Sequence, residues 1–153
     1  MMVYRLSAQT YSNDLSGYGA EKSGGRWNGQ GFAIIYTASS RALAVVEIAV
    51  HTPLGIMPLN YFLTTIEFPD DASVARIAIA GLPQNWNRNP FIKDTQQIGN
   101  DFIINNTHLI LQVPSASVPG DHNYLINPRH ADFKKVRIIN TEEFEFDLRL
   151  FKK

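Results

Sequence analysis

The sequence predicts an α+β fold in one domain, in which a few helices pack against a mixed or antiparallel sheet. Apolar and aromatic runs of strand length recur along the chain and alternate with turn residues. Only residues 41–51 and 95–106 carry the longer apolar pattern of a main helix. The 153 residues suffice for one core, and they show no repeat, low-complexity tract or domain boundary. Many short strands with two main helices are typical of this fold class.

The first predicted elements are a strand, a long turn-rich segment and a second strand. Residues 2–6 have strand character, and residues 7–24 are polar and rich in turn formers, which predicts a wrapping loop. Residues 23–31 hold four glycines, and this density indicates a loop of defined shape. Residues 32–36 then form an apolar run of strand length.

A helix with an unusual carboxylate follows. Ser39 and Ser40 are natural N-caps for a helix over residues 41–51, which the proline and glycine of residues 52–55 bring to an end. This helix is apolar almost all round, a pattern that predicts burial. Glu47 in its middle therefore needs a partner or a function.

The rest of the chain alternates strands and turns around one further helix. Predicted strands cover residues 61–68, 74–80, 108–113 and 123–126, the second helix covers residues 95–106, and further apolar segments cover residues 136–139 and 144–148. In that helix Ile98, Phe102 and Ile103 are expected to point inward, while Gly99 weakens the helix. The irregular segment that contains Trp86 is expected to border a pocket.

Composition excludes several classes of function. Fourteen basic and fourteen acidic side chains cancel, which argues against direct nucleic-acid binding and leaves room only for a local basic pocket. Without cysteine there is no disulfide, thiolate nucleophile or cysteine zinc site, and four scattered histidines predict no metal site. Residues 1–10 lack a signal-peptide pattern, and no apolar run approaches membrane-spanning length. We therefore expect a soluble, cytoplasmic protein without membrane contact.

Two side chains have both a structural and a chemical interpretation. Glu47 either pairs with a cation, surfaces on a polar stripe, or forms the floor of a cleft; His51 lies one helical turn on, within reach of it. Arg5, the one charged residue of its strand, either lies at the surface or projects into a cavity. Its planar fork would there suit phosphate or carboxylate recognition.

Three separated blocks of the sequence resemble the signature of the RES-domain toxins. The blocks are residues 23–28 (SGGRWN) with Gly31, Tyr36, residues 42–47 (ALAVVE) and His51; residues 113–116 (VPSA); and residues 123–130 (NYLINPRH). With Arg5 they extend over most of the chain, so residues 1–153 resemble a single RES domain. The one departure is Gly-Gln after Asn28, where many members have prolines.

This resemblance implies the toxin of a bacterial type II toxin–antitoxin system, with a fold similar to ADP-ribosyltransferase toxins. Members consume NAD by cleaving the nicotinamide–ribose bond, through hydrolysis or phosphorolysis, and some transfer ADP-ribose to a protein. NAD is then a substrate, with phosphate as a potential co-substrate, and no cofactor is implied. The implied partner is an Xre-type helix-turn-helix antitoxin that blocks the site and binds DNA.

By resemblance, the functional set maps onto Arg5, Arg26, Tyr36, Glu47 and Ser115. Glu47 would stabilise the positive charge that develops on the ribose and hold its 2′-hydroxyl. Tyr36 would offer a face to the nicotinamide, and Arg5 and Arg26 would clamp the pyrophosphate or a ribose hydroxyl. Ser115 would exchange a hydrogen bond with the ligand.

Three further candidates for substrate contact have structural alternatives. Trp27 is more typical of a core anchor than of a stacking surface for a ligand, since tryptophan mainly contributes burial. Asn28 is suited to brace its loop. His51 either orients Glu47 or ends the helix, where a cation is favourable.

The sequence leaves several properties open. The activity is NAD hydrolysis or phosphorolysis, ADP-ribosylation of a protein, or non-catalytic nucleotide binding as a co-repressor module. The oligomeric state, a homo-oligomer included, is also open. Only Lys152 and Lys153 follow the last apolar pattern, and no helix precedes Arg5, so inhibition is expected from a separate antitoxin, which would also supply DNA binding.

Overall fold

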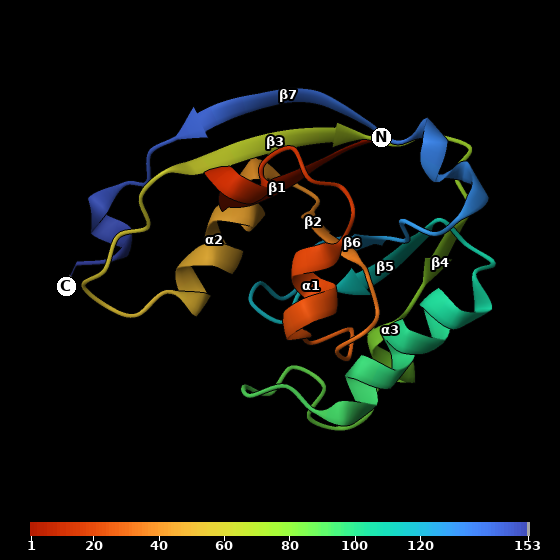
Figure 1. Ribbon diagram of the computed structural model, residues 1–153. Helices are drawn as coiled ribbons and strands as arrows, with labels where there is room; N and C mark the ends of the chain where they lie inside the picture. The colour runs from red at the N-terminus through yellow and green to blue at the C-terminus, as the bar shows by residue number, and fades with distance from the viewer. Residues whose placement is uncertain (153) are drawn as a thin grey trace.

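A computed structural model describes residues 1–152, and Lys153 lies outside the described residues. The strands are β1 (Met2–Ala8), β2 (Ile35–Ala38), β3 (Tyr61–Glu67), β4 (Val74–Arg76), β5 (Ile110–Pro114), β6 (His122–Ile126) and β7 (Arg137–Phe144). The helices are α1 (Tyr18–Ser23), α2 (Arg41–His51) and α3 (Lys93–Asn105), with short 3₁₀ turns η1 (Gln9–Tyr11), η2 (Ile79–Gly81), η3 (Ala131–Lys135) and η4 (Leu148–Leu150). The predicted α+β class with a mixed sheet and a few helices is confirmed (Figure 1).

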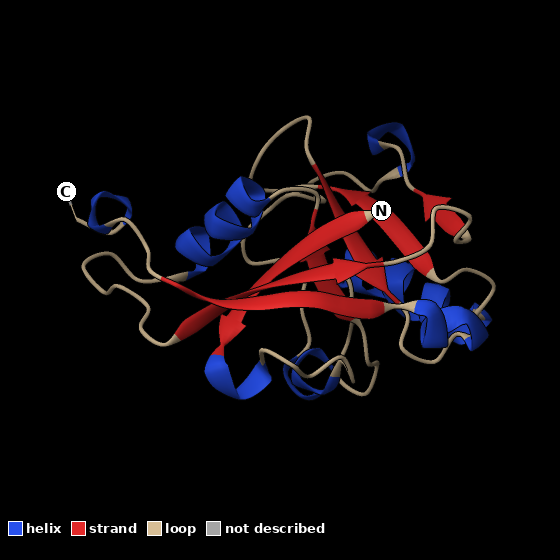
Figure 2. Ribbon diagram, turned by 90° about the horizontal axis from the view of Figure 1, so that it is seen from above, coloured by secondary structure: helices blue, strands red, loops and turns tan. Residues whose placement is uncertain are grey.

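The strands form one sheet, drawn in red in Figure 2. Their order is β4-β5-β6-β2-β1-β3-β7. All neighbours are antiparallel except β4 and β5, which run parallel. β1 pairs with β3 along its whole length, yet it meets β2 only at Tyr4↔Ala38. The sheet is therefore two well-paired parts, β1-β3-β7 and β2-β6-β5-β4, joined by a seam of a single ladder position.

Each main helix covers one part of the sheet (Figure 1). In α2, Leu43 and Ala44 pack in a cluster with Leu6 and Leu63 of β1 and β3. The second cluster joins α3 to β5 and β6, and it contains Trp27, Ile34, Phe102, Ile103, Leu111, Val113 and Leu125. The inward face predicted for this helix is confirmed. Burial of such apolar side chains is the main stabilising term for both packings.

Helix α2 matches the predicted residues 41–51, and its N-cap is confirmed because Ser40 Oγ accepts a hydrogen bond from the Leu43 N–H at 3.0 Å. The predicted burial of the helix is wrong, since only Leu43 and Ala44 are buried and Val50 is 55% exposed. The reason is that one apolar flank of α2 borders a cavity instead of the core. No helix within residues 1–152 has the length and apolarity that a membrane crossing needs.

Helix α1 falls in the segment predicted to be a loop. Its sequence is polar and contains Gly19, so local propensity does not reveal it. Tertiary contacts stabilise it instead, because Ala20 packs on the α3 cluster and its carbonyl accepts a bond from the Asn28 side chain at 2.8 Å. Gly17, at φ +74°, starts the helix in a conformation that favours glycine.

Two strand predictions were wrong in their extent, and two apolar segments fall near one longer strand. The strand predicted at residues 32–36 is β2, shifted toward the C-terminus, because the Phe32 carbonyl is taken by the Asn28 amide and pairing with β6 begins only at Ile35. The strand predicted at residues 74–80 ends at Arg76, where its pairing with β5 stops. The apolar segments at residues 136–139 and 144–148 correspond to β7, which runs through the polar residues between them, and to the approach to η4.

Candidate active site

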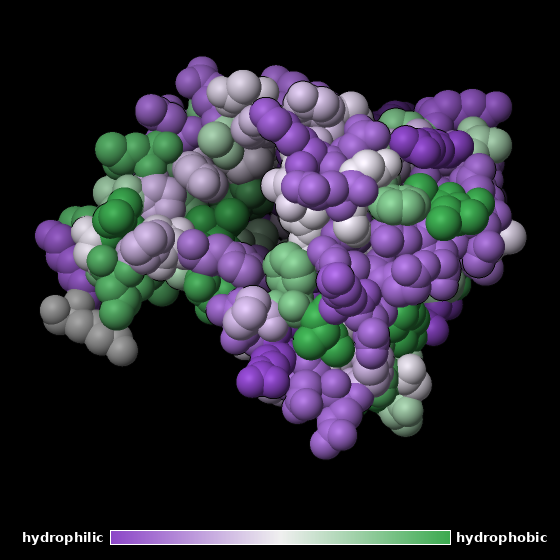
Figure 3. Space-filling model, turned by 60° about the horizontal axis from the view of Figure 1, so that its bottom comes forward, coloured by the Kyte–Doolittle hydropathy of each residue, from purple (hydrophilic) through white to green (hydrophobic). Residues whose placement is uncertain are grey.

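A cavity of about 750 Å³ opens where the two parts of the sheet diverge. Residues 4–6 of β1 and residues 36–38 of β2 line it from either side of the seam. The glycine-rich loop over residues 23–27 and the exposed flank of α2 add two further walls, and residues 87–91 add part of another. Figure 3 shows the molecule hollowed between an apolar and a polar lobe on this side. The cavity is large enough for a ligand of nucleotide size.

Glu47 projects into this cavity from the middle of α2. Its Oε1 accepts hydrogen bonds from Ser115 Oγ and Asn123 Nδ2, each at 3.0 Å, and its Oε2 accepts one from Ser117 Oγ at 3.2 Å. All three donors are neutral, so the interpretation of Glu47 as one half of a structural ion pair is not supported. The three bonds fix both carboxylate oxygens in the cavity wall, as a preorganised charge requires.

Ser115 supports Glu47 from behind. It is only 3% exposed, and its Oγ accepts the backbone N–H groups of Ser117 and Val118 at 3.1 and 3.0 Å while donating to Glu47. It is outside the cavity lining. Ser115 is therefore better placed to orient Glu47 than to contact the ligand, which was the role expected from the sequence. The turn after β5 places the hydroxyl there, because the Ser115 N–H also donates to the Asp121 carbonyl at 2.8 Å.

Ser117 and Asn123 are site residues that the sequence interpretation missed. Both line the cavity and donate to Glu47. Asn123 opens the third RES-like block, which was the only sequence signal for it. Its Nδ2 is committed to Glu47, and its buried Oδ1 has no hydrogen-bond partner within residues 1–152. A buried acceptor without a donor is uncommon, and one in a cavity wall suits a ligand that brings the donor.

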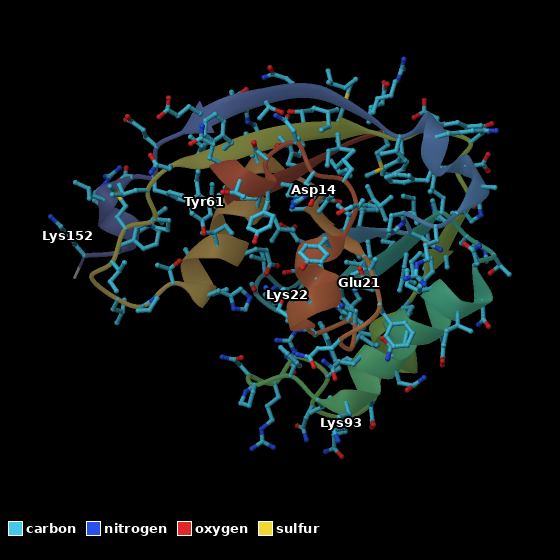
Figure 4. The ribbon with its side chains drawn as sticks, in the orientation of Figure 1. Asp14, Glu21, Lys22, Tyr61, Lys93 and Lys152 are labelled. Atoms are coloured by element: carbon cyan, nitrogen blue, oxygen red, sulfur yellow. The ribbon has the colours of Figure 1, made fainter. Side chains whose placement is uncertain are left out.

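Arg5 lines the cavity, as one interpretation of the sequence expected. Its Nη1 donates to the main-chain carbonyl of Asp14 at 2.6 Å, on the segment that runs from β1 to α1 (Figure 4). Burial lowers the pKa of the Arg5 guanidinium, and the Asp14 charge opposes that shift. An arginine pKa starts so high that Arg5 remains a cation at neutral pH.

Arg26 lies in the glycine-rich loop and also lines the cavity. Its Nη1 donates to the carbonyls of Trp86 and Arg88, both at 2.8 Å, which ties two segments far apart in the sequence. Burial lowers the pKa of Arg26, while the negative charge of Glu47 raises it, with a smaller contribution of the same sign from Tyr36. Within residues 1–152 its Nε and Nη2 donate no hydrogen bond, so the side-on fork of this cavity-lining guanidinium has no protein partner.

Tyr36 lines the cavity with its ring, but its hydroxyl belongs to the loop. The O–H donates to Asn28 Oδ1 at 2.6 Å and accepts the Trp27 N–H at 3.0 Å. Desolvation raises the pKa of Tyr36, with the Trp27 bond and the Arg26 charge opposing it. The phenol therefore stays neutral and serves as a brace, which leaves the ring as the part that can meet a ligand.

Trp27 and Asn28 have mainly structural positions. Trp27 belongs to the cavity lining but is only 2% exposed, because it packs in the α3 cluster. Asn28 is fully buried outside the cavity lining. The Asn28 amide donates to the carbonyls of Ala20 and Phe32 at 2.8 and 3.0 Å, so it fixes the loop. The substrate contact expected for Asn28 is therefore not favoured by its position, and the bracing alternative is.

Helix α3 holds this loop from outside. Gly99 faces the main chain of Trp27 so closely that an added Cβ would lie 1.5 Å from its carbonyl oxygen. Gln96 Nε2 donates to the carbonyls of Gly25 and Asn28 at 3.0 and 3.1 Å. Gly99, which weakens the helix by propensity, is thus required by the close approach of the loop that carries Arg26.

His51 lies exposed on the cavity rim at the end of α2. It is not among the three hydrogen-bond partners of Glu47. Of the two roles predicted for His51, the structure favours the one at the helix end over orientation of Glu47. Its exposed side chain is accessible to a ligand there.

The charged groups of the lining are Arg5, Arg26 and Glu47, with His51 at the rim. Two cations and one carboxylate in a half-enclosed site suit a ligand with several negative charges and one centre of positive charge. Within residues 1–152, no three His, Asp or Glu side chains are grouped to hold a metal ion. The lining therefore provides anion binding together with stabilisation of a developing cation.

Comparison with solved structures shows the same fold in a chain from the M. tuberculosis MbcT-MbcA toxin-antitoxin complex. The two superpose with a TM-score of 0.74, over 94% of this chain and 83% of that one. Their sequence identity is 22%, so the likeness concerns the fold.

Comparison with known sequences gives nearer relatives. The chain is 42% identical over 149 residues to the "Prs ADP-ribosylating toxin" of Sphingobium sp. (strain YBL2), covering 95% of this chain and 92% of that protein. It is 38% identical over 152 residues to "Toxin Res" of Yersinia enterocolitica, covering 98% and 99% of the two chains. The profile of the family described as "RES domain" matches residues 2–148. The chain therefore belongs to the RES domain family.

Proposed function

We propose that this protein is the toxin of a bacterial toxin–antitoxin pair and that it consumes NAD by cleaving the bond between nicotinamide and ribose. The observation that carries the proposal is Glu47, a carboxylate fixed by three neutral donors in a cavity that also holds Arg5 and Arg26. NAD has a matching set of charges, with a pyrophosphate and a cationic nicotinamide. Relatives named as toxins support the toxin part of the proposal.

In the proposed reaction the glycosidic C–N bond breaks and its electron pair leaves with nicotinamide, which departs neutral. Positive charge then builds on the ribose C1′ and ring oxygen. Glu47 stabilises this charge and accepts a hydrogen bond from a ribose hydroxyl, as carboxylates do in glycosidases. The acceptor adds to C1′ and gives up a proton to solvent, which completes the balance.

The other lining residues bind and orient the dinucleotide. The side-on fork of Arg26 is placed for two parallel bonds to phosphate oxygens, and Arg5 adds a second charge. The ring of Tyr36 provides a flat wall for nicotinamide. Asn123 Oδ1 is an acceptor for a ribose hydroxyl, since it lacks a donor within residues 1–152.

A second candidate is transfer of ADP-ribose to a protein from the same site. The relative named "Prs ADP-ribosylating toxin" favours it. The two reactions share the bond that breaks and differ in the acceptor, which is water or phosphate in one and a protein side chain in the other. The demands on Glu47, Arg5 and Arg26 are identical in both.

An enzyme that destroys NAD needs an inhibitor, and a separate antitoxin is the proposed partner. The MbcT-MbcA complex, whose toxin chain shares this fold, supports a protein partner. We propose an Xre-type helix-turn-helix antitoxin that covers the cavity near Arg26 and Glu47. DNA binding by the pair would come from the antitoxin, because this chain has no net charge.

The chemical test is incubation of the purified protein with NAD, with and without phosphate, followed by identification of the products. Free nicotinamide with ADP-ribose indicates hydrolysis, and a phosphorylated ADP-ribose indicates phosphorolysis. Glu47→Gln is the matched variant, since it keeps shape and removes charge. Its hydroxyl partners can rotate and the Asn123 amide can turn, so the fold is retained, while the rate should fall about a hundredfold or more. Unchanged NAD with the wild type, alone or with a bacterial lysate as acceptor, contradicts the proposed chemistry.

The cellular test is expression of the wild type beside Glu47→Gln in bacteria, with growth and total NAD followed together. Growth arrest with loss of NAD in the wild type alone is the expected result. Arrest by both variants would indicate a poison that does not need the carboxylate. Normal growth and unchanged NAD with the wild type would refute the toxin proposal.

A further inference from the structure

The loop between η2 and α3 forms a wall of the cavity that the proposed reaction has not used. It covers residues 82–92 and extends below α1 in Figure 1, and it ends at Lys93, labelled in Figure 4. Three of its side chains line the cavity, namely Asn87, Asn89 and Phe91. The two asparagine amides form no hydrogen bond within residues 1–152, which leaves both donors and acceptors open.

Phe91 has an unusual setting for a large apolar side chain. It is 41% exposed and belongs to no apolar core cluster among the described residues, yet it lines the cavity. Trp86, five residues earlier on the same loop, shows the contrast, because its ring packs against Trp27 with centroids 6.2 Å apart. One aromatic thus anchors the loop, and the other is left with a face for a ligand.

Arg26 connects this loop to the rest of the cavity lining. Its Nη1 donates to the carbonyls of Trp86 and Arg88, so the guanidinium is fixed against the loop. Arg26, Glu47 and Phe91 all line the same cavity. A ligand whose phosphates bind Arg26 and whose reacting ribose meets Glu47 can therefore extend its remaining part toward the loop.

We propose that residues 82–92 form a subsite for the purine base of the dinucleotide, with Phe91 as the stacking surface. This proposal rests on the proposed function, which supplies the dinucleotide. A purine has a large π-face for Phe91 and a polar edge with both donors and acceptors. The amides of Asn87 and Asn89 offer the complementary pair, since each carries a donor and an acceptor.

The test separates the two halves of the dinucleotide. ADP carries the purine and the phosphates, and nicotinamide mononucleotide carries the other base. ADP lacks the bond that breaks, whereas nicotinamide mononucleotide retains it, so both ligands are titrated against proteins that also carry Glu47→Gln. Binding is measured by titration of the intrinsic fluorescence or by calorimetry. The protein has two tryptophans, Trp27 and Trp86, and their contact places the fluorescent reporter on the anchor of this loop.

Phe91→Ala should weaken ADP binding roughly tenfold or more, because stacking of a base on an aromatic ring is lost. Binding of nicotinamide mononucleotide should stay within about twofold, and Phe91→Tyr should restore ADP binding because it keeps the aromatic face. Tyr18→Ala is the matched control. This aromatic side chain is 53% exposed and lies outside the cavity lining, so its loss should leave the affinity for both ligands unchanged.

Three results would overturn the subsite. They are equal ADP binding by wild type and Phe91→Ala, a selective loss of nicotinamide mononucleotide, and no binding of ADP to the wild type. A wild type that binds ADP through Phe91 but leaves NAD intact would contradict the proposed function and preserve the subsite. Normal NAD consumption, together with ADP binding that does not depend on Phe91, would contradict the subsite and preserve the proposed function.

Discussion

The carbonyl oxygen of Trp27 occupies the space where residue 99 would carry a side chain, so α3 and the loop of Arg26 touch main chain to main chain. Only glycine permits this distance. The contact places the guanidinium of the preceding residue at the cavity, although neither Trp27 nor Gly99 needs to meet a ligand. The arrangement of the site therefore depends on a helix that stands behind it.

Gly99→Ala should destabilise the protein by about 1–3 kcal/mol or more, since overpacking forces the loop away from the helix. Gly19→Ala is the matched control, because Gly19 is also helical and an added Cβ has nothing within 4 Å. Urea unfolding of the three proteins measures the effect. Equal stability of Gly99→Ala and the wild type would mean that the loop moves without resistance.

Ser115→Ala should lower kcat for NAD cleavage about tenfold or more and leave KM nearly unchanged. The substitution removes one of the donors that fix Glu47, a bond to a charged group worth about 1.5–3 kcal/mol, but no ligand contact. Ser117→Ala removes the longer bond at 3.2 Å and should have a smaller effect. A rise in KM with unchanged kcat for Ser115→Ala would instead support the direct ligand contact that the sequence predicted.

Arg26→Lys should reduce kcat/KM for NAD about tenfold to a hundredfold, although the charge is retained. A lysine ammonium is a point charge and cannot hold two carbonyls while offering a side-on fork to phosphate. Arg88→Lys is the control, because Arg88 contributes its carbonyl to this contact. Near-normal kinetics of Arg26→Lys would reduce Arg26 to a general positive charge.

Tyr36→Phe should cost about 1–3 kcal/mol of stability at neutral pH, because it leaves Asn28 Oδ1 and the Trp27 N–H without their partner. The difference from the wild type should narrow at alkaline pH. Burial raises the pKa of Tyr36 above its ordinary value of 10.0, so above that value the unfolded chain loses the proton first. The contribution of Tyr36 is thus complete below pH 10.0 and declines above it by roughly 1.4 kcal/mol per pH unit.

Urea unfolding of wild type and Tyr36→Phe at about pH 8 and about pH 11 measures this linkage. The other tyrosines and the lysines are common to both proteins, so their titration cancels in the difference. A stability difference that does not change with pH would show that Tyr36 ionises as freely in the folded state as in the unfolded chain.

Patterns with strong local causes allowed prediction of much of the fold. The helix over residues 41–51 has its serine cap, its apolar run and its proline stop in adjacent positions, and its bounds were correct. Helix α1 has no such signal, because its stability comes from Asn28 and the α3 cluster. The same distinction explains β7, whose polar middle pairs with β3 at the edge of the sheet.

Without the resemblance, a site residue could be predicted only where its own type is unusual for its place in the sequence. Glu47 is conspicuous because a carboxylate in an apolar helix needs an explanation, and Arg5 is conspicuous as the one charge of a strand. Ser117 and Asn123 gain their importance from a distance of about 3 Å to a residue some seventy positions earlier, which spacing does not reveal. Ser115 was found by resemblance, and the structure changed its expected contact from ligand to Glu47.

The single ladder position between β1 and β2 has a consequence for how the cavity binds. Beyond Tyr4 and Ala38 the main chains of the two strands separate, and residues 4–6 and 36–38 face the opening. Peptide groups along that opening are directional hydrogen-bonding groups that no side-chain substitution removes. Mutation of the surrounding side chains can therefore alter which molecule is preferred, while the peptide groups of this rim stay in place in each such variant of the chain.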